Sequence, residues 1–424
     1  MNVKALWLAI LGLLLSTSLY GQDLAGDWQG TLQTGNQPLR LIIRFTRADG
    51  GAWAGTFYSI DQSRDWGAGA PIASISQQGT QVKFALDGIG GSYEGRLGRD
   101  ASTLEGTWTQ RRPLPLVLHR ATPETAWKDP ATHTIQFVTV DQNVKLEVLD
   151  FGGSGRRLLF LAGLGNTAHV FDTFAPKFTA THHVFAITRR GFGDSSAPTE
   201  GYGADRLGDD VLAVLDALKL SRPVLAGHSI AGEELSSIAS RHPERVAGLV
   251  YLDAGYPYAF FNAGRGDFLL DAIDLRRKLD LVVNGPIDSR STIKELLVDL
   301  PRFEKNLAAR QKELDSMRPA LLATEPRAVQ RAIMTGGHKY TDLSRVPILA
   351  IYALPHELPG AADDPVRAAR EAADLDTTGV QAAAFENGVP SARVVRIPHA
   401  NHYVFRSNEA DVLREMRLFL AELK

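Results

Sequence analysis

Residues 223–231 read Pro-Val-Leu-Ala-Gly-His-Ser-Ile-Ala, and this stretch says more about the fold than any other. Four apolar residues lead into a Gly-x-Ser-x-small pentapeptide whose serine is Ser229, and a stretch of helical character, 233–241, follows at once. An apolar strand, a tight turn and a helix in this order hold a serine on a strained elbow with its hydroxyl exposed. The stretch therefore predicts a nucleophilic serine at the end of a buried strand.

Strand-like and helical segments alternate on both sides of this elbow. Strand candidates are 134–140, 145–151, 157–161, 183–187, 223–226, 246–252, 347–352 and 392–397. Several are continuous apolar runs, as expected of parallel strands that are covered on both faces. Helical stretches such as 205–218, 233–241 and 409–423 lie between or after them. This alternation predicts an α/β fold with a mostly parallel, doubly wound sheet.

One interval breaks the alternation. Nearly a hundred residues separate Asp253 from Pro347, and their pattern is mostly helical, including 268–283, 292–314 and 326–334. A connection this long is rarely a structureless loop inside a compact domain. We interpret it as a helical cap, about 256–340, over the ends of the strands.

The N-terminal part of the chain has a different pattern. From residue 24 to about 120, short alternating segments are broken by Gly, Asn and Asp, which predicts an antiparallel sheet or small barrel. Segments 26–32, 52–57 and 104–108 each pair an aromatic residue with a nearby Gly-Thr, and we interpret these aromatics as core, with a ligand platform as the alternative. The expected organisation is an all-β domain at 22–120, a linker at 121–133 and an α/β domain at 134–424.

The first residues resemble an export signal. A lysine at position 4 precedes an apolar run from 5 to 15 and then small polar residues, which predicts a signal peptide over 1–21. The run is shorter than the roughly 20 apolar residues that span a membrane, so no stable membrane anchor is expected after cleavage. We expect a secreted or periplasmic protein.

Composition excludes several function classes. The net charge of −2 gives no reason to expect a nucleic-acid partner. The chain contains no cysteine, which excludes disulfides, thiolate zinc sites and a cysteine nucleophile. A small molecule is the expected partner.

A nucleophilic serine needs a base, and the candidates come late in the chain. Pro398-His399-Ala400-Asn401-His402-Tyr403 follows the last strand candidate and precedes the final helix. His402 lies mid-loop and is the expected base, with His399 as its competitor. The two histidines could also suggest a metal site, but no third ligand lies nearby in the sequence. We therefore expect neither a metal nor another cofactor.

With these residues in hand, the chain resembles the α/β-hydrolase superfamily over roughly 134–424. Four segments match in order: Ala-Gly-Leu-Gly-Asn at 162–166, Arg-Gly-Phe-Gly-Asp-Ser at 190–195, the elbow at Ser229, and Asn401-His402. The resemblance implies that the backbone N–H groups of Ile230 and Leu164 form an oxyanion hole. Ala162 replaces a frequent His and Ala231 a frequent Gly, and Arg190 is expected to brace its turn.

The acid that would orient the base is ambiguous. The superfamily usually places an Asp just beyond the strand candidate 347–352, where this chain has His356 and then Glu357. Some members instead carry the carboxylate at the end of the preceding strand, where Asp253 lies. We take Asp253 as the expected acid and Glu357 as the alternative.

A serine nucleophile points to acyl transfer. By resemblance it disfavours dehalogenase and epoxide-hydrolase chemistry, which use a carboxylate nucleophile, and leaves a carboxylesterase-like hydrolase acting through an acyl-serine. The aromatic residues after Asp253 either line an apolar acyl pocket or pack the cap; they are Tyr256, Tyr258, Phe260, Phe261 and Phe268. Two other functions remain open: a proline-iminopeptidase-type aminopeptidase, whose amine-binding acids would be Asp267, Asp271 and Asp274, and a non-catalytic binding protein that uses the β domain.

Overall fold

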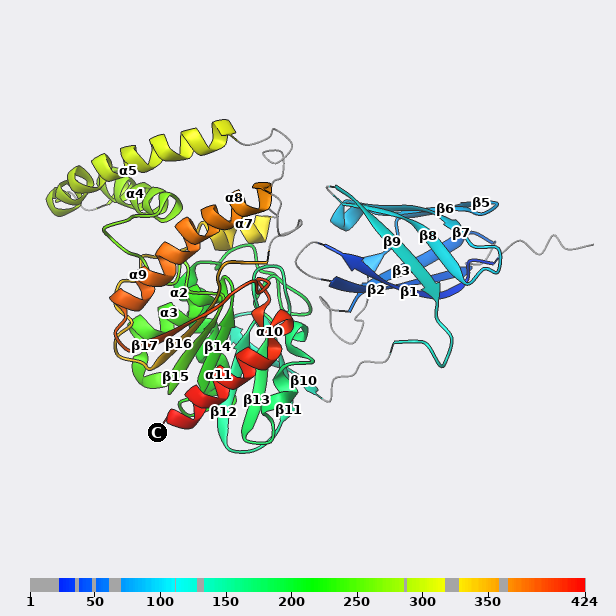
Figure 1. Ribbon diagram of the computed structural model, residues 1–424, viewed down its shortest axis with the longest axis horizontal. Helices are drawn as coiled ribbons and strands as arrows, with labels where there is room; N and C mark the ends of the chain where they lie inside the picture. The colour runs from blue at the N-terminus through cyan, green and yellow to red at the C-terminus, as the bar shows by residue number, and fades with distance from the viewer. Residues whose placement is uncertain are drawn as a thin grey trace, which may run out of the picture. The chain divides into compact units, whose positions relative to one another are not determined.

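The computed structural model describes residues 23–34, 38–47, 51–60, 70–110, 112–127, 133–285, 288–316, 328–357 and 365–423. Its contacts divide the chain into two compact units, which separate in sequence near residue 130 (Figure 1). The expected signal peptide lies outside the described residues. Within them, no helix has both the length and the apolar character that crossing a membrane requires.

The first unit is built on an antiparallel sheet of nine strands in the order β4-β3-β2-β1-β9-β8-β7-β6-β5. The strands are β1 Gly26–Gln33, β2 Pro38–Arg47, β3 Trp53–Ser59, β4 Ala70–Pro71, β5 Ser74–Gln78, β6 Gln81–Leu86, β7 Gly91–Leu97, β8 Thr103–Gln110 and β9 Arg112–Arg120. β4 pairs with β3 and β5 pairs with β6, so the segment 70–78 joins the two edges of the sheet. The sheet therefore closes on itself as a small barrel.

Aromatic side chains fill the interior of this barrel. Trp28 and Trp108 are both buried, and Phe57 stacks on Trp108 with ring centroids 5.2 Å apart. Trp53 differs, because it is only partly buried and lies under the guanidinium of Arg47 at 3.8 Å. The core interpretation of the aromatic segments is thus correct for 26–32 and 104–108.

The second unit contains the α/β sheet, with eight strands in the order β10-β11-β13-β12-β14-β15-β16-β17. They are β10 Thr134–Asp141, β11 Val144–Gly152, β12 Arg156–Leu161, β13 His182–Ile187, β14 Val224–His228, β15 Gly248–Leu252, β16 Ile348–Ala353 and β17 Ala392–Ile397. β10 and β11 run antiparallel to their neighbours, and from β13 to β17 every pair is parallel. The predicted α/β fold is confirmed, and each expected strand is present to within two residues.

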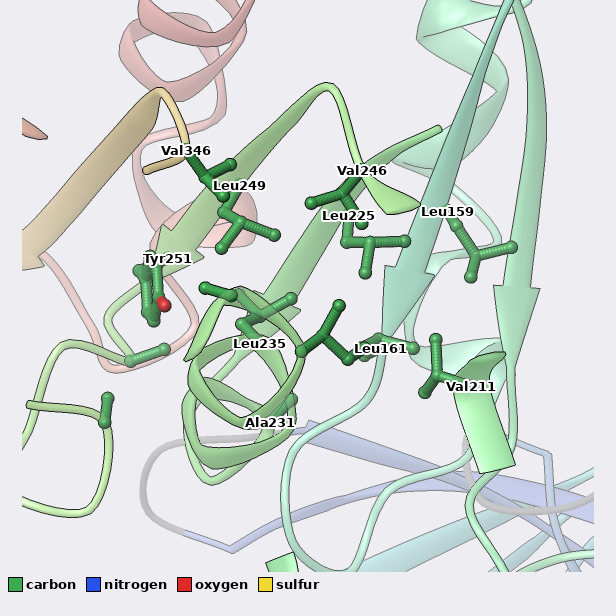
Figure 2. Close-up of a cluster of buried hydrophobic side chains, with 14 of the residues drawn as sticks. Leu159, Leu161, Val211, Leu225, Ala231, Leu235, Val246, Leu249, Tyr251 and Val346 are labelled. Carbon is green, nitrogen blue, oxygen red and sulfur yellow. The ribbon is translucent and has the colours of Figure 1, made fainter. Parts of the chain in front are cut away.

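Both faces of this sheet are buried, because successive side chains of a strand point to opposite sides. On one face Leu159, Leu161 and Leu225 pack with residues of α2 Ala204–Ala217 and α3 Ala231–Arg241 (Figure 2). On the other face Leu158 and Phe160 join a cluster with residues of α10 Val404–Ser407 and α11 Glu409–Glu422. Continuous apolar strands are the sequence signature of this double coverage.

The helical interval lies between β15 and β16. It contains α4 Phe268–Asn284, α5 Arg290–Ser316 and α7 Ala328–Met334, at the three places where helices were expected. Asp267 caps α4, because its side chain accepts a hydrogen bond from the backbone N–H of Leu270 at 3.0 Å. α4 and α5 pack against each other (Figure 1).

A further helical segment between β16 and β17 was not predicted. It consists of α8 Pro365–Asp374, a π-turn at Leu375–Gly379, and α9 Val380–Gly388. α9 is rich in alanine, which blurs the contrast between an apolar and a polar face. Its Phe385 is nevertheless fully buried in the core of the sheet.

Candidate active site

Ser229 lies on the turn between β14 and α3. Its φ is +54°, in the left-handed region that residues other than glycine rarely adopt. The strand before it is buried, whereas Ser229 itself is partly exposed. Gly232 permits the close approach of α3 to the neighbouring segment, since a Cβ there would lie 2.1 Å from the carbonyl oxygen of Ala254. Local strain is thus combined with an accessible hydroxyl.

A continuous hydrogen-bonded chain leads from Ser229 to Asp253. The Ser229 hydroxyl lies 2.9 Å from Nε2 of His402, and Nδ1 of His402 lies 2.6 Å from Oδ2 of Asp253. The three residues come from the ends of different segments: the β14–α3 turn, the residue after β15, and the loop after β17. With the hydroxyl donating to Nε2 and Nδ1–H donating to the carboxylate, His402 is the neutral tautomer of a base.

Asp253 is fully buried and also has a positive φ of +46°. Burial alone would raise the pKa of this carboxyl, but hydrogen bonds from His356 and His402 outweigh burial and lower the pKa to about 2. Its other oxygen, Oδ1, accepts from the backbone N–H of Ala353 at 3.1 Å. Asp253 is therefore ionised throughout the neutral range and held at both oxygens.

His228, the residue before the serine, supports the loop that carries His402. Its Nε2–H donates to the carbonyl oxygen of His402 at 3.0 Å, and its side chain is buried. Burial is the main reason that the pKa of His228 is lowered to about 3. His228 is thus a neutral donor, and sequence analysis gave it no role.

The competing candidates lie elsewhere. Glu357 is exposed, and its backbone N–H donates to the carbonyl oxygen of Ala400. His399 is also exposed, with its backbone N–H bound to the carbonyl oxygen of Pro355 at 2.7 Å. The structure brings Ser229, His402 and Asp253 together, and it brings neither Glu357 nor His399 into that chain.

His356 occupies the place where an Asp is usual, and it also binds Asp253. Its Nε2 lies 3.0 Å from Oδ2 of Asp253, and its Nδ1 lies 3.0 Å from Oδ2 of Asp374 on α8. The sequence pointed to the position of His356 but not to Asp374, because the helix that carries Asp374 was not predicted. Two imidazoles thus share one carboxylate oxygen.

The two expected oxyanion donors lie beside the serine. Among the described residues, neither the N–H of Ile230 nor that of Leu164 donates to a protein acceptor. Gly163 lets this loop approach the serine, since a Cβ there would lie 2.7 Å from Nδ1 of His228 and 3.2 Å from Cβ of Ser229. Arg189 anchors the loop from behind through Nη2, which donates to the carbonyl oxygen of Ala162 at 2.8 Å.

The side of the elbow next to Ile230 is apolar. A cluster of Tyr202, Leu207, Ile230 and Ile333 packs there with partly buried Leu164, Phe192, Tyr258, Val329 and Ala332. The members at 329–333 belong to α7, so the helical interval contributes directly to this surface. Arg190, on the turn after β13, forms a bidentate ion pair with Asp210 in which both hydrogen bonds are 2.6 Å long. Arg190 therefore braces its turn.

The five aromatic residues after Asp253 separate into different roles. Tyr258 joins the apolar cluster beside Ile230; burial raises its pKa well above 10, the charges of Asp253 and Glu233 add to that, and a hydrogen bond with Ser229 opposes it. Tyr256 donates to Oδ2 of Asp253 at 3.1 Å. The others pack the fold; they are Phe260 and Phe261, both buried, and Phe268, which stacks on Phe303.

Among the described residues, two groups of side chains have the spacing that could hold a metal ion, with ligand atoms within 4.8 Å of one another. One is Asp253, His356 and His402, which does not include His399, the other histidine of the pair considered from the sequence. The other is His133, His169 and Asp172, a buried cluster in which Nδ1 of His169 lies 3.2 Å from Oδ2 of Asp172. In both groups the histidines already pair with carboxylates, which is sufficient to explain the clustering.

Comparison with known proteins agrees with the fold. The model of the alpha/beta hydrolase family matches residues 158–415. Among curated relatives, 2-(acetamidomethylene)succinate hydrolase of Mesorhizobium japonicum is 26% identical over 278 residues, covering 63% of this chain and 89% of that protein. Epoxide hydrolase 4 of Mus musculus is 30% identical over 145 residues, covering 33% of this chain and 40% of that protein.

Two solved structures are also similar to this chain. A structure described as Est816, an N-acyl homoserine lactone degrading enzyme, is 23% identical; the match covers 67% of this chain and all of that one, with a TM-score of 0.43. The structure of E-2-(acetamidomethylene)succinate hydrolase is 20% identical, with 68% of this chain covered, 99% of that one, and a TM-score of 0.42.

Proposed function

The chain belongs to the alpha/beta hydrolase family, and from that premise we propose that it is a serine hydrolase that cleaves an ester or a related acyl bond through an acyl-serine intermediate. The observation that carries the proposal is the chain of hydrogen bonds from Ser229 through His402 to Asp253, at 2.9 and 2.6 Å. Serine, base and acid have the mutual geometry that nucleophilic catalysis needs.

In the proposed reaction His402 accepts the Ser229 proton at Nε2 while Oγ attacks the acyl carbon. Asp253 stabilises the imidazolium that forms and keeps Nδ1 protonated. The N–H groups of Ile230 and Leu164 donate to the developing oxyanion. His402 then gives its proton to the leaving atom of the departing group. In the second half, Nε2 of His402 takes a proton from a water molecule whose oxygen attacks the acyl carbon, and that proton passes to Oγ of Ser229 as the carboxylic acid leaves.

We propose a neutral, largely apolar acyl or aryl substituent as the substrate group beside the elbow. The support is the apolar cluster around Ile230, in which Leu164, Phe192 and Val329 offer no charge to a ligand. In this proposal the helical interval acts as a cap, and α7 shapes the pocket. The proposal does not specify the leaving group, so esters, thioesters and lactones are all candidate substrates.

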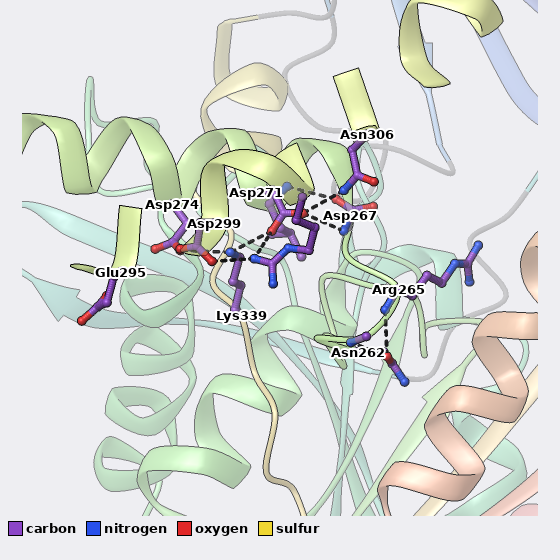
Figure 3. Close-up of polar contacts among 12 residues, drawn as sticks. Asn262, Arg265, Asp267, Asp271, Asp274, Glu295, Asp299, Asn306 and Lys339 are labelled. Atoms are coloured by element: carbon purple, nitrogen blue, oxygen red, sulfur yellow. Dashed lines mark hydrogen bonds and ion pairs between the residues drawn. The ribbon is translucent and has the colours of Figure 1, made fainter. Parts of the chain in front are cut away.

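The aminopeptidase alternative draws no support from the acidic residues proposed to hold an amine. Asp271 binds Lys339 and Asn306 (Figure 3). Asp271 also binds Arg302, and Asp274 binds Arg277 and Lys339. Asp267 caps α4. These carboxylates already have partners within the helical interval, so none is left to neutralise a substrate ammonium.

The experiment that tests the proposed function uses the purified full chain and short p-nitrophenyl esters. We expect hydrolysis by the wild type, covalent labelling of Ser229 by an alkyl fluorophosphonate, and loss of both in Ser229→Ala. Ser344→Ala is a matched control, because this exposed hydroxyl donates to Oδ1 of Asp342 at 2.6 Å and lies outside the chain from Ser229 to Asp253. A wild type that is neither active nor labelled would falsify the proposal.

Export remains a proposal that rests on residues 1–21. If the segment is a cleaved signal, N-terminal sequencing of protein recovered from the periplasm or medium will begin near residue 22. Recovery of protein with an intact N-terminus from the cytoplasm alone would contradict it.

A further inference from the structure

His356 is held between two carboxylates. Nε2 lies 3.0 Å from Oδ2 of Asp253, while Nδ1 lies 3.1 and 3.0 Å from the two oxygens of Asp374. The His356 side chain is 19% exposed, that of Asp374 is 16% exposed, and Asp253 is fully buried. Each ring nitrogen faces an acceptor that has no proton to give, so both nitrogens carry protons and the ring is an imidazolium.

Asp374 is itself fixed in place. It is the last residue of α8, and its Oδ2 accepts the backbone N–H of His356 at 2.7 Å. Its Oδ1 accepts the hydroxyl of Thr378, in the π-turn that follows, at 2.9 Å. The backbone contact and the ring contact together hold the His356 side chain in one orientation, with Nε2 toward Asp253.

Asp253 receives an unusual number of donors on one oxygen. His402 at 2.6 Å, His356 at 3.0 Å and the Tyr256 hydroxyl at 3.1 Å all bind Oδ2. A buried carboxylate needs such donors, because burial of an unpaired charge is costly. Burial lowers the pKa of His356, but Asp253 and then Asp374 outweigh it and raise that pKa to about 9, so the ring is charged at neutral pH.

We propose that His356, anchored by Asp374, is a positioning residue for the reaction of Ser229: it fixes Asp253 toward His402 and places a positive charge beside the His402 ring. This inference rests on the proposed function. The His356 and His402 rings have centroids 6.4 Å apart and share Oδ2 of Asp253. A positive charge at that distance disfavours a second positive charge on the His402 ring.

The groups that face His356 come from three segments of the chain. Asp253 follows β15, Tyr256 lies three residues later, and Asp374 ends α8. His402 approaches from the loop after β17. Among the described residues that surround His356, the carboxylates of Asp253 and Asp374 therefore favour its positive charge. The other two groups are the imidazole of His402 and the phenol of Tyr256.

The test compares the pH dependence of kcat/KM for the wild type and its variants. His356→Gln keeps a donor toward Asp253 but removes the charge, so the acid limb of the profile should move to higher pH by about one unit. His356→Ala also removes the donor and should lower kcat by about ten- to a hundredfold. Asp374→Asn should shift the limb in the same direction as His356→Gln, and should add nothing in the His356→Gln background.

His183→Gln is the matched control. Nε2 of His183 lies 2.8 Å from Oδ1 of Asp150, so it is a second histidine–carboxylate pair, placed at the start of β13 rather than at the carboxyl ends of the strands. Its profile should coincide with that of the wild type. A His356→Gln profile that also coincides, or an Asp374→Asn effect that adds fully to it, overturns the proposal.

A measurement independent of activity separates this proposal from the proposed function. The ring resonances of His356, followed by NMR in the full chain, should show a protonated ring at neutral pH and titrate with a pKa of about 9. Titration near the ordinary histidine pKa of about 6.5 would show that His356 is not held as a cation between the two carboxylates, and would overturn this proposal even in an active enzyme. The proposed function fails if Ser229 is not labelled and no ester is cleaved. If the pKa of His356 is still about 9 in that case, the positioning role falls with the proposed function, although His356 is still held as a cation between the two carboxylates.

Discussion

The loops after β16 and β17 each deliver an imidazole to the same carboxylate oxygen, yet the two imidazoles differ in the group beyond. On the far side of His402, Nε2 meets the Ser229 hydroxyl at 2.9 Å. On the far side of His356, Nδ1 meets the Asp374 carboxylate at 3.0 Å. A hydroxyl can donate a proton to its partner and a carboxylate cannot, so one ring is suited to be a base and the other to be a fixed cation.

The largest expected effect comes from removing the carboxylate that the two rings share. Asp253→Asn presents an amide to His402. The amide can stabilise the wrong tautomer of the His402 ring, and it no longer balances the charge of the imidazolium. We expect kcat on p-nitrophenyl esters to fall by about 10⁴, the typical cost of losing this acid. Glu357→Gln, the alternative acid, should leave kcat unchanged because Glu357 is exposed and outside the chain.

Steady-state kinetics of both variants, with circular dichroism to verify folding, decides between the two carboxylates. If Glu357→Gln lost activity and Asp253→Asn kept it, the acid role would belong to the loop after β16 and the comparison of the two imidazoles would collapse.

The same region shows what could be predicted from the sequence. The apolar strands, the elbow at Ser229 and the position of His402 after the last strand were recognisable because local pattern and chain order determine them. Asp253 could be named only as one of two candidates, since its distance from His402 depends on how two loops 149 residues apart meet. Asp374 could not be found at all, because its helix was not recognised and its role exists only through tertiary contact.

A second effect concerns stability against pH. The pKa of His356 is raised to about 9. Burial lowers the pKa of His169, but its hydrogen bonds with Asp172 and Glu147 outweigh burial and raise that pKa to about 10. Each raised pKa contributes stability that is fully present below the unfolded value of about 6.5 and is lost as pH rises through the folded value. We expect the second unit to lose on the order of 2 kcal/mol for His356 alone between about pH 6.5 and pH 9.5, a figure reduced for solvent screening of the partly exposed ring.

The two units can be followed separately in this experiment. All six tryptophans precede residue 128, and Trp28, Trp53 and Trp108 lie on strands of the first unit, so tryptophan fluorescence follows that unit and not the second. The α-helices of the described chain lie in the second unit and dominate far-UV circular dichroism. Urea unfolding should show a pH-dependent transition by circular dichroism. His356→Gln should flatten that dependence in part, leaving the share of His169; an unchanged dependence would mean that His356 is not charged.

The smallest expected effect comes from removing the Tyr256 hydroxyl, the third donor to the carboxylate oxygen that the two imidazoles share. The hydroxyl of Tyr256 donates to Oδ2 of Asp253 at 3.1 Å and lies 3.3 Å from Nε2 of His356, so it contacts both the shared carboxylate and the cationic ring. Tyr256→Phe removes one of three donors on Oδ2 and leaves the other two, so we expect kcat to fall by about fivefold, the worth of a single hydrogen bond. Tyr340→Phe, which removes the hydroxyl that donates to Asp205 at 2.7 Å, is the matched control and should leave the pH profile of kcat/KM unchanged. A loss as large as that of Asp253→Asn would mean that Tyr256, and not His356, holds the carboxylate in place.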